Sequence, residues 1–165
     1  MTVLELLMQE FEQETLTSRK MISRVPDDKF SWKPHPKSMD LKTLSTHVAD
    51  LPTWIEMAMN TEELDFATAP YAPAQVNSTK DLVDYFEKNI VIGRKALESA
   101  DPAKFEEPWV LRTGETIHLT TTRYGLIRTA LSQIIHHRAQ LGVFLRLLDI
   151  PIPGSYGPSA DEMDF

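Results

Sequence analysis

The sequence predicts an all-α fold, a four-helix bundle with a short β-hairpin before its last helix. The eleven prolines leave four long segments, only one of which contains a proline. These segments carry apolar residues at three- and four-residue steps, as amphipathic helices require. Four helices in a chain of 165 residues bury their apolar faces best against one another. We therefore expect one domain over residues 1–165.

The first two predicted helices cover residues 2–25 and 40–60. The first should stop at Pro26, because proline removes a backbone donor and clashes with the preceding turn. The second begins at Asp40, whose side chain can accept a hydrogen bond from the first turn as an N-cap. Pro52 lies within the second helix, where we expect a kink that leaves the apolar stripe intact.

The third predicted helix covers residues 78–100, and the fourth covers residues 120–149. Ser78 or Thr79 caps the third helix, and Pro102 follows its end. Apolar residues lie almost all round the fourth helix, so we expect it to be the most buried or to share a face with a partner subunit. The apolar residues that lie outside the core stripe of this helix would leave a large apolar surface exposed on a lone bundle, so they predict a homodimer. They are Ile127, Leu131, Ile134, Ile135 and Leu145.

The connections between the helices carry two further signals. Apolar residues alternate on both sides of Thr113-Gly114, which predicts the β-hairpin. Residues 62–77 form one of several long connections, so tight turns between antiparallel helices are not required. The tail, residues 151–165, contains three prolines and two glycines, and we expect it to lie irregularly across the end of the bundle.

The composition limits the chemistry that the chain can perform. It has no cysteine and five histidines, which excludes disulfides, zinc fingers, iron–sulfur clusters and a cysteine nucleophile. Any metal ion must therefore be held by nitrogen and oxygen. The net charge is −7 and no run of basic residues could follow a phosphate backbone, so we expect no nucleic-acid partner.

The same sequence predicts a cytoplasmic protein with no membrane partner. Its first residues include several glutamates and lack the basic start and apolar block of a signal peptide. No apolar run approaches the roughly 20 residues that a membrane-spanning helix needs.

Three of the five histidines lie on predicted helices. His137 shares the apolar stripe of the fourth helix with Gln133, one turn earlier. His136 lies about 100° further round the same helix, off that stripe. His47 lies at the edge of the buried stripe of the second helix, from which it could reach inward. On pattern alone, His47 and His137 are either metal ligands or hydrogen-bonded core residues, because helical bundles use inward side chains for both.

The other two histidines give no such signal. His35 lies between two prolines, and His118 follows the predicted hairpin turn, so we expect both to be surface residues or to pack locally. The sequence also lacks a phosphate-binding glycine loop, a helical metalloprotease pattern and a nucleophile elbow.

Three stretches of the chain resemble the DinB-like family of bacterial helical proteins, the DinB and YfiT-like group. They are residues 44–54 around His47, the His136-His137-Arg138 block with the residues up to 141, and the exit from the last helix, residues 145–154. The likeness covers nearly the whole chain. It implies an up-down-down-up bundle, often a homodimer, with a divalent ion such as nickel or zinc held by three histidines.

The resemblance implies a ligand set that this chain does not fully supply. The ligand from the second helix falls on His47, and the second ligand from the fourth helix falls on His137. The remaining ligand falls on Gln133, whose carbonyl oxygen is a harder and weaker donor than an imidazole nitrogen. His136 could compensate only by swinging from a position off the stripe.

The resemblance also implies an activity and leaves an alternative. Metal-dependent thiol transferases belong to this superfamily, so we expect a metal-dependent enzyme that takes a small-molecule substrate and a low-molecular-weight thiol as cosubstrate. The catalytic residues are not identified by the sequence, which offers Glu10, Glu14 or Asp50 as a base. The alternative is a non-catalytic, stress-related binding or dimerisation module whose metal site has degraded at Gln133.

Overall fold

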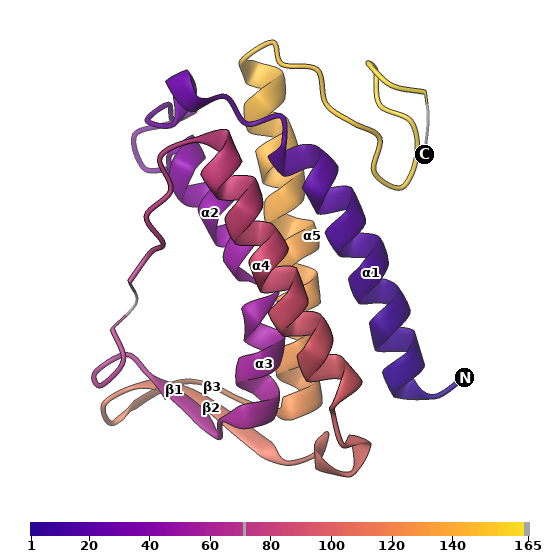
Figure 1. Ribbon diagram of the computed structural model, residues 1–165. Helices are drawn as coiled ribbons and strands as arrows, with labels where there is room; N and C mark the ends of the chain where they lie inside the picture. Colours follow the sequence, from indigo (N-terminus) through magenta and orange to yellow (C-terminus); the bar gives the residue numbers. More distant parts are fainter. Residues whose placement is uncertain (71, 164–165) are drawn as a thin grey trace.

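The computed structural model describes residues 1–70 and 72–163, which form helices packed side by side and a small sheet at one end (Figure 1). In chain order the elements are α1 (Val3–Ile22), α2 (Leu41–Asp50), α3 (Thr53–Asn60), β1 (Glu63–Asp65), α4 (Thr79–Glu98), β2 (Pro108–Thr113), β3 (Thr116–Thr122) and α5 (Arg123–Leu147). The prediction of an all-α, up-down-down-up four-helix bundle is therefore wrong. Part of the connection over residues 62–77, at Tyr71, and the end of the predicted tail, Asp164 and Phe165, lie outside the described residues.

The first correction is the three-stranded mixed sheet. β2 and β3 form the predicted hairpin, with Gly114 at a φ of +56° in its turn. β1 pairs in parallel with the other edge of β2, so the strand order is β1-β2-β3. With only three residues, β1 is too short to show an alternating pattern in the sequence. Residues 120–122, predicted as the start of the last helix, belong to β3.

The second correction is that Pro52 divides the second predicted helix into α2 and α3. Proline lacks the N–H that would continue the helical ladder. Side chains bind carbonyl groups that lie beside the break: Asn89 Nδ2 donates to Ala49 O at 2.9 Å, and Thr53 Oγ1 donates to Asp50 O at 2.8 Å. Asn89 is itself buried, so α4 is tied to the break.

The helix starts follow the side chains that favour them. Asp40, Ser78 and Thr122 are the N-caps of α2, α4 and α5, and each accepts a hydrogen bond from the backbone N–H three residues later. The cap predicted at Asp40 is thus confirmed, and of the two residues predicted for α4, Ser78 and Thr79, the cap is Ser78. The C-terminal end of α3 is capped by a side chain from α5. Arg123 Nη1 donates hydrogen bonds to the carbonyl oxygens of Ala58 and Thr61 at 2.8 and 2.6 Å.

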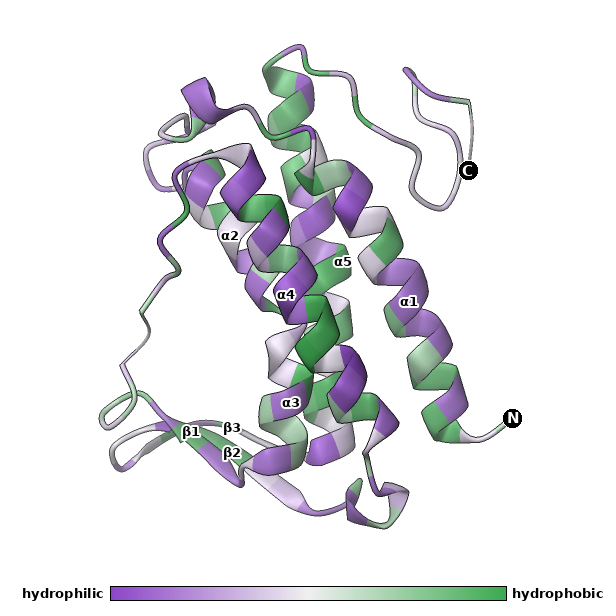
Figure 2. Ribbon diagram, viewed as in Figure 1, coloured by the Kyte–Doolittle hydropathy of each residue, from purple (hydrophilic) through white to green (hydrophobic). Residues whose placement is uncertain are grey.

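The last helix, α5, lies against α1, α2 and α3 and carries a large part of the core. Figure 2 shows that α1 and α4 each carry hydrophilic and hydrophobic residues along their length, as helices with one buried face do. The residues that predicted a homodimer are mostly used inside the chain, because Ile127, Leu131, Ile134 and Leu145 are 0% exposed. The homodimer stays a prediction. In the described part of the chain, no helix is both long enough and apolar enough to span a bilayer.

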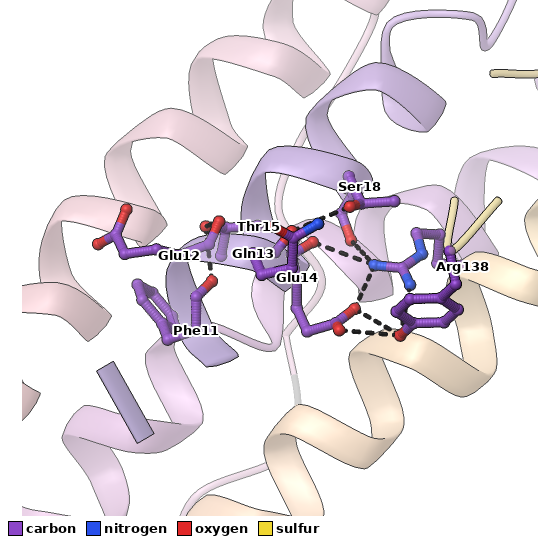
Figure 3. A network of polar contacts seen from close by, with 9 residues as sticks. Phe11, Glu12, Gln13, Glu14, Thr15, Ser18 and Arg138 are labelled. Carbon is purple, nitrogen blue, oxygen red and sulfur yellow. Dashed lines mark hydrogen bonds and ion pairs between the residues drawn. The ribbon is translucent and has the colours of Figure 1, made fainter. Parts of the chain in front are cut away.

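A buried polar cluster joins α1, α5 and the C-terminal tail. Arg138 Nη1 lies 2.6 Å from Glu14 Oε2, and the two side chains are only 2% and 5% exposed. The same nitrogen donates to the carbonyl oxygen of Glu14 and to Ser18 Oγ, as Figure 3 shows. Arg138 Nη2 donates to the Tyr156 hydroxyl at 2.9 Å, and that hydroxyl lies 2.8 Å from both carboxylate oxygens of Glu14. The tail is therefore fastened along the helices.

Replacing Gly93 by alanine should destabilise the fold. A Cβ atom at Gly93 would lie 2.6 Å from Pro52 O and 3.0 Å from the Phe11 ring, so α4 could not approach the α2–α3 break as closely. We expect Gly93→Ala to lower the free energy of unfolding in urea by about 1–3 kcal/mol, the usual cost of overpacking.

The matched control is Gly142→Ala on α5, where the nearest atom to the added Cβ is the flexible end of Met21 at 3.3 Å. The higher helix propensity of alanine, about 1 kcal/mol, should offset any small adjustment there. Equal losses of stability in the two variants would contradict the close approach at Gly93.

Candidate metal centre

Two of the predicted ligands lie in contact. His47 projects from α2 and His137 from α5, and their ring centroids are 4.7 Å apart with the planes at 75°. The Trp54 ring lies on another side of His47, with its centroid 6.0 Å away. The structure thus brings together two imidazoles that are far apart in the sequence, and both are partly buried.

The orientation of His137 leaves one ring nitrogen free to act as a ligand. His137 Nδ1 lies 2.8 Å from Gln140 Oε1, one turn later on α5. Because an amide oxygen only accepts hydrogen bonds, Nδ1 carries the proton in this pair. The lone pair is then on Nε2, and a hydrogen bond of this kind fixes the ring of a metal-binding histidine.

The third predicted ligand, Gln133, carries an unpaired acceptor. Its Oε1 is buried and has no hydrogen-bond partner among the described residues. Leaving a buried polar oxygen unpaired costs about 1–3 kcal/mol, so such atoms usually have a cation, water or donor as partner. Gln133 lies one helical turn before His137, on the same side of α5. The donor set of two imidazole nitrogens and one amide oxygen therefore fits a divalent ion.

The surroundings keep both imidazoles neutral. Burial, the largest cause, and the nearby His137 lower the pKa of His47, while Asp50 opposes this change. Burial also lowers the pKa of His137, the hydrogen bond that its ring donates to Gln140 opposes this change, and His136 lowers the pKa further. Since both pKa values fall from the ordinary 6.5, the rings are unprotonated at pH 7 and can donate lone pairs.

An apolar cavity of about 520 Å³ opens beside His47. α2, α3 and the segment around β1 form its walls. The lining residues are Met39, Thr43, His47, Asp50, Thr53, Trp54, Met57, Leu64 and Phe66. Leu64 and Phe66 could not be predicted as lining residues, because they lie in and just after β1, in a segment whose sequence indicates only a connection between helices. The volume suits a small organic molecule.

The cavity also identifies which of the three predicted bases is near the histidines. Asp50 lines it and accepts a hydrogen bond from the Tyr85 hydroxyl at 2.5 Å. Glu10 pairs with Arg128, and Glu14 belongs to the buried cluster with Arg138. Only Asp50 of these three carboxylates lines the cavity together with His47.

A second hollow, of about 420 Å³ and lined by residues with polar side chains, lies along α5 at Gln133. Its lining residues are Arg128, Thr129, Ser132, Gln133 and His136. His136 is exposed, and its ring centroid is 4.8 Å from that of His137. It therefore lies next to the pair, although it points off the stripe as the helical spacing predicts.

The remaining histidines make local contacts. His35 Nδ1 accepts a hydrogen bond from the backbone N–H of Lys37 at 3.2 Å, and His118 Nε2 lies 2.9 Å from Thr113 Oγ1. Within residues 1–70 and 72–163, no three histidine, aspartate or glutamate side chains gather closely enough to hold an ion. Beside the histidine pair, the buried oxygen of Gln133 is therefore the candidate for a third protein donor.

The comparisons with known proteins support the fold. No protein-family model matches the chain, and no curated protein matches it. A DinB-like protein from Bacillus subtilis has a similar solved structure, with a TM-score of 0.70 and 15% identity, covering 91% of this chain and 96% of that chain. A DinB-like protein from Bacillus cereus superposes with a TM-score of 0.68 and 19% identity, covering 91% and 95%.

These likenesses confirm the resemblance to DinB-like proteins at the level of the fold. A shared fold at this low identity does not carry a reaction with it. The chemistry must therefore be argued from the residues of the site.

In the metal-free protein, we expect His47 and His137 to titrate below pH 6.5 in an NMR titration. The unfolded chain then binds more protons than the folded chain between the lowered pKa values and 6.5. The contribution of the two neutral histidines to the free energy of unfolding is therefore fully present above pH 6.5. It is lost as the pH falls from 6.5 through the lowered pKa values. A variant with both histidines changed to asparagine should lose this part of the pH dependence of unfolding. Titration of either ring at or above pH 6.5 would contradict its burial.

Proposed function

We propose that this protein is a divalent-metal-dependent enzyme whose ion is held by His47, His137 and Gln133. The contact between the two imidazoles from α2 and α5, with centroids 4.7 Å apart, carries the proposal. The unpaired Gln133 Oε1 supports a third donor one turn away. The neighbouring apolar cavity supports a small-molecule substrate.

The donor set favours nickel or zinc, which imidazole nitrogen suits well. A bound ion of this kind lowers the pKa of a thiol or water that coordinates it and so supplies a nucleophile near pH 7. With two imidazoles and one amide oxygen, the affinity should be lower than that of a site with three imidazoles.

The residues around the pair can bind and orient two reactants. Trp54, Met57 and Phe66 provide apolar surface that holds an apolar substrate and excludes water beside His47. Asp50 lies in the same cavity, where its carboxylate can accept a proton from the reacting group while the Tyr85 hydroxyl holds it in place.

The second reactant is proposed to be a low-molecular-weight thiol. The chain has no cysteine, so the sulfur must come from a cosubstrate. The hollow beside Gln133 supports this reactant, since the side chains of Ser132 and His136 can bind its hydrophilic part. The reaction class is therefore transfer of a small thiol to an apolar acceptor, in which the thiol gives up its proton to Asp50, its sulfur forms a bond to a carbon of the acceptor, and the group displaced from that carbon leaves with the bonding electrons.

The alternative function is a non-catalytic binding or dimerisation protein with a degraded metal site. Within the described residues, no three histidine, aspartate or glutamate side chains are arranged so that they could hold an ion, and this favours the alternative. The two proposals differ in metal content. Both keep the cytoplasmic location and the homodimer that the sequence predicts, and neither involves nucleic acid or membrane.

The protein purified without an affinity tag, or reconstituted with nickel or zinc, should contain one ion per chain. We expect His47→Ala and His137→Ala each to abolish stoichiometric metal, measured by mass spectrometry of the metal after dialysis. His35→Ala is the matched control and should retain the ion, because His35 is an exposed loop residue. No bound metal even after reconstitution would support the non-catalytic alternative.

Changing Gln133 to histidine should raise the affinity for zinc at least tenfold, because it replaces an amide oxygen by an imidazole nitrogen. Gln133→Leu, of similar size, should lower the affinity by removing the third donor. Competition with a chromogenic chelator measures both values. Unchanged affinity in both variants would show that position 133 does not contact the ion.

A further inference from the structure

Another cavity, of about 610 Å³, lies between the C-terminal half of α5 and the tail that follows it. Met21, near the end of α1, also contributes to its wall. From α5 the lining residues are Ile135, Arg138, Ala139, Gly142, Val143, Arg146 and Leu147. The volume is within the range of about 300–1,000 Å³ that small-molecule sites occupy.

Small residues on both walls create this hollow. Ala139 and Gly142 face it from α5, and Ser155 and Gly157 face it from the tail. Because these residues carry little or no side chain, the tail can run beside α5 without filling the space between them.

The tail is held in place by ion pairs and hydrogen bonds at several points. Asp161 pairs with Arg146 and accepts the backbone N–H of Ile152 at 2.9 Å. Glu162 pairs with Arg24, just beyond α1. Together with the Tyr156 hydroxyl in the buried cluster, these contacts make the tail a fixed wall of the cavity.

The charged groups at the cavity are already paired within the chain. Arg138 is bound to Glu14, and Arg146 is bound to Asp161. The Tyr156 hydroxyl is engaged by both Glu14 and Arg138. A charged ligand would have to displace one of these partners or lose water without replacement, which is costly.

Two apolar side chains at the cavity are by contrast exposed to solvent. Val143 and Leu147, one turn apart on α5, are each 59% exposed and both line the cavity. A ligand that covers them gains the free energy of removing apolar surface from water.

The cavity is separate from the histidine pair. Gly142 is five residues after His137, which places it about 140° round α5 at 100° per residue. A ligand in the cavity would therefore lie on the opposite side of the helix from His47.

We propose that this cavity is a binding site for an uncharged, apolar small molecule. Its ligand lies between α5 and the tail and covers Val143 and Leu147. Binding there does not require the metal ion.

The test uses a matched pair of fluorescent probes, N-phenyl-1-naphthylamine and its sulfonated analogue 1-anilinonaphthalene-8-sulfonate. The neutral probe should bind in this cavity at least tenfold more tightly than the anionic one, with the same affinity in metal-free and zinc-loaded protein. Equal or tighter binding of the sulfonate would overturn the preference for an uncharged ligand.

Two tryptophan variants locate the site. Ala139→Trp fills the cavity from an exposed position and should weaken the neutral probe at least tenfold. Thr43→Trp fills the cavity beside His47 and is the control that should leave the affinity unchanged. The opposite pattern, or no effect of Ala139→Trp, would overturn the proposal. Val143→Trp repeats the test at another exposed residue, and thermal unfolding checks that each variant is folded.

Discussion

The buried ion pair between Glu14 and Arg138 fixes how α5 is turned within the helical bundle. Arg138 must point at α1 to keep its partner, and breaking such a pair by removing one member costs about 3–5 kcal/mol. Consecutive residues on a helix differ by about 100°, so this constraint also directs His137 toward α2 and His47. The hydroxyl of Tyr156 extends the cluster to the tail, and burial followed by the hydrogen bond to Glu14 raises the pKa of that hydroxyl.

The two sides of α5 consequently have different chemistry. One side presents His137 and the unpaired oxygen of Gln133 beside an apolar and a polar hollow. The other side, which includes Gly142, faces the tail across an apolar cavity whose charged groups are satisfied internally. The break at Pro52 contributes to the first side, because α3 leaves α2 there and carries Trp54 to the ring of His47.

Sequence patterns could predict what depends on local spacing. The N-caps and the inward direction of His47 and His137 follow from helical periodicity, and the hairpin follows from alternation around Gly114. β1 was not predictable, since three residues carry no period and its pairing with β2 is a long-range contact. The burial of Arg138 was not predictable either, because a charged residue on a helix is expected to be exposed to solvent. Its partner Glu14 lies on another helix, far away in the sequence.

The coordination of the ion is the point on which the proposed chemistry depends most directly. X-ray absorption spectroscopy of the zinc-loaded protein reports the number of imidazole and oxygen donors at the metal. We predict two imidazole nitrogens at about 2.0–2.1 Å together with oxygen donors, one of them lost in Gln133→Leu. A spectrum with three imidazoles would show that His136 is recruited instead of Gln133. A spectrum with fewer than two would contradict the site at His47 and His137.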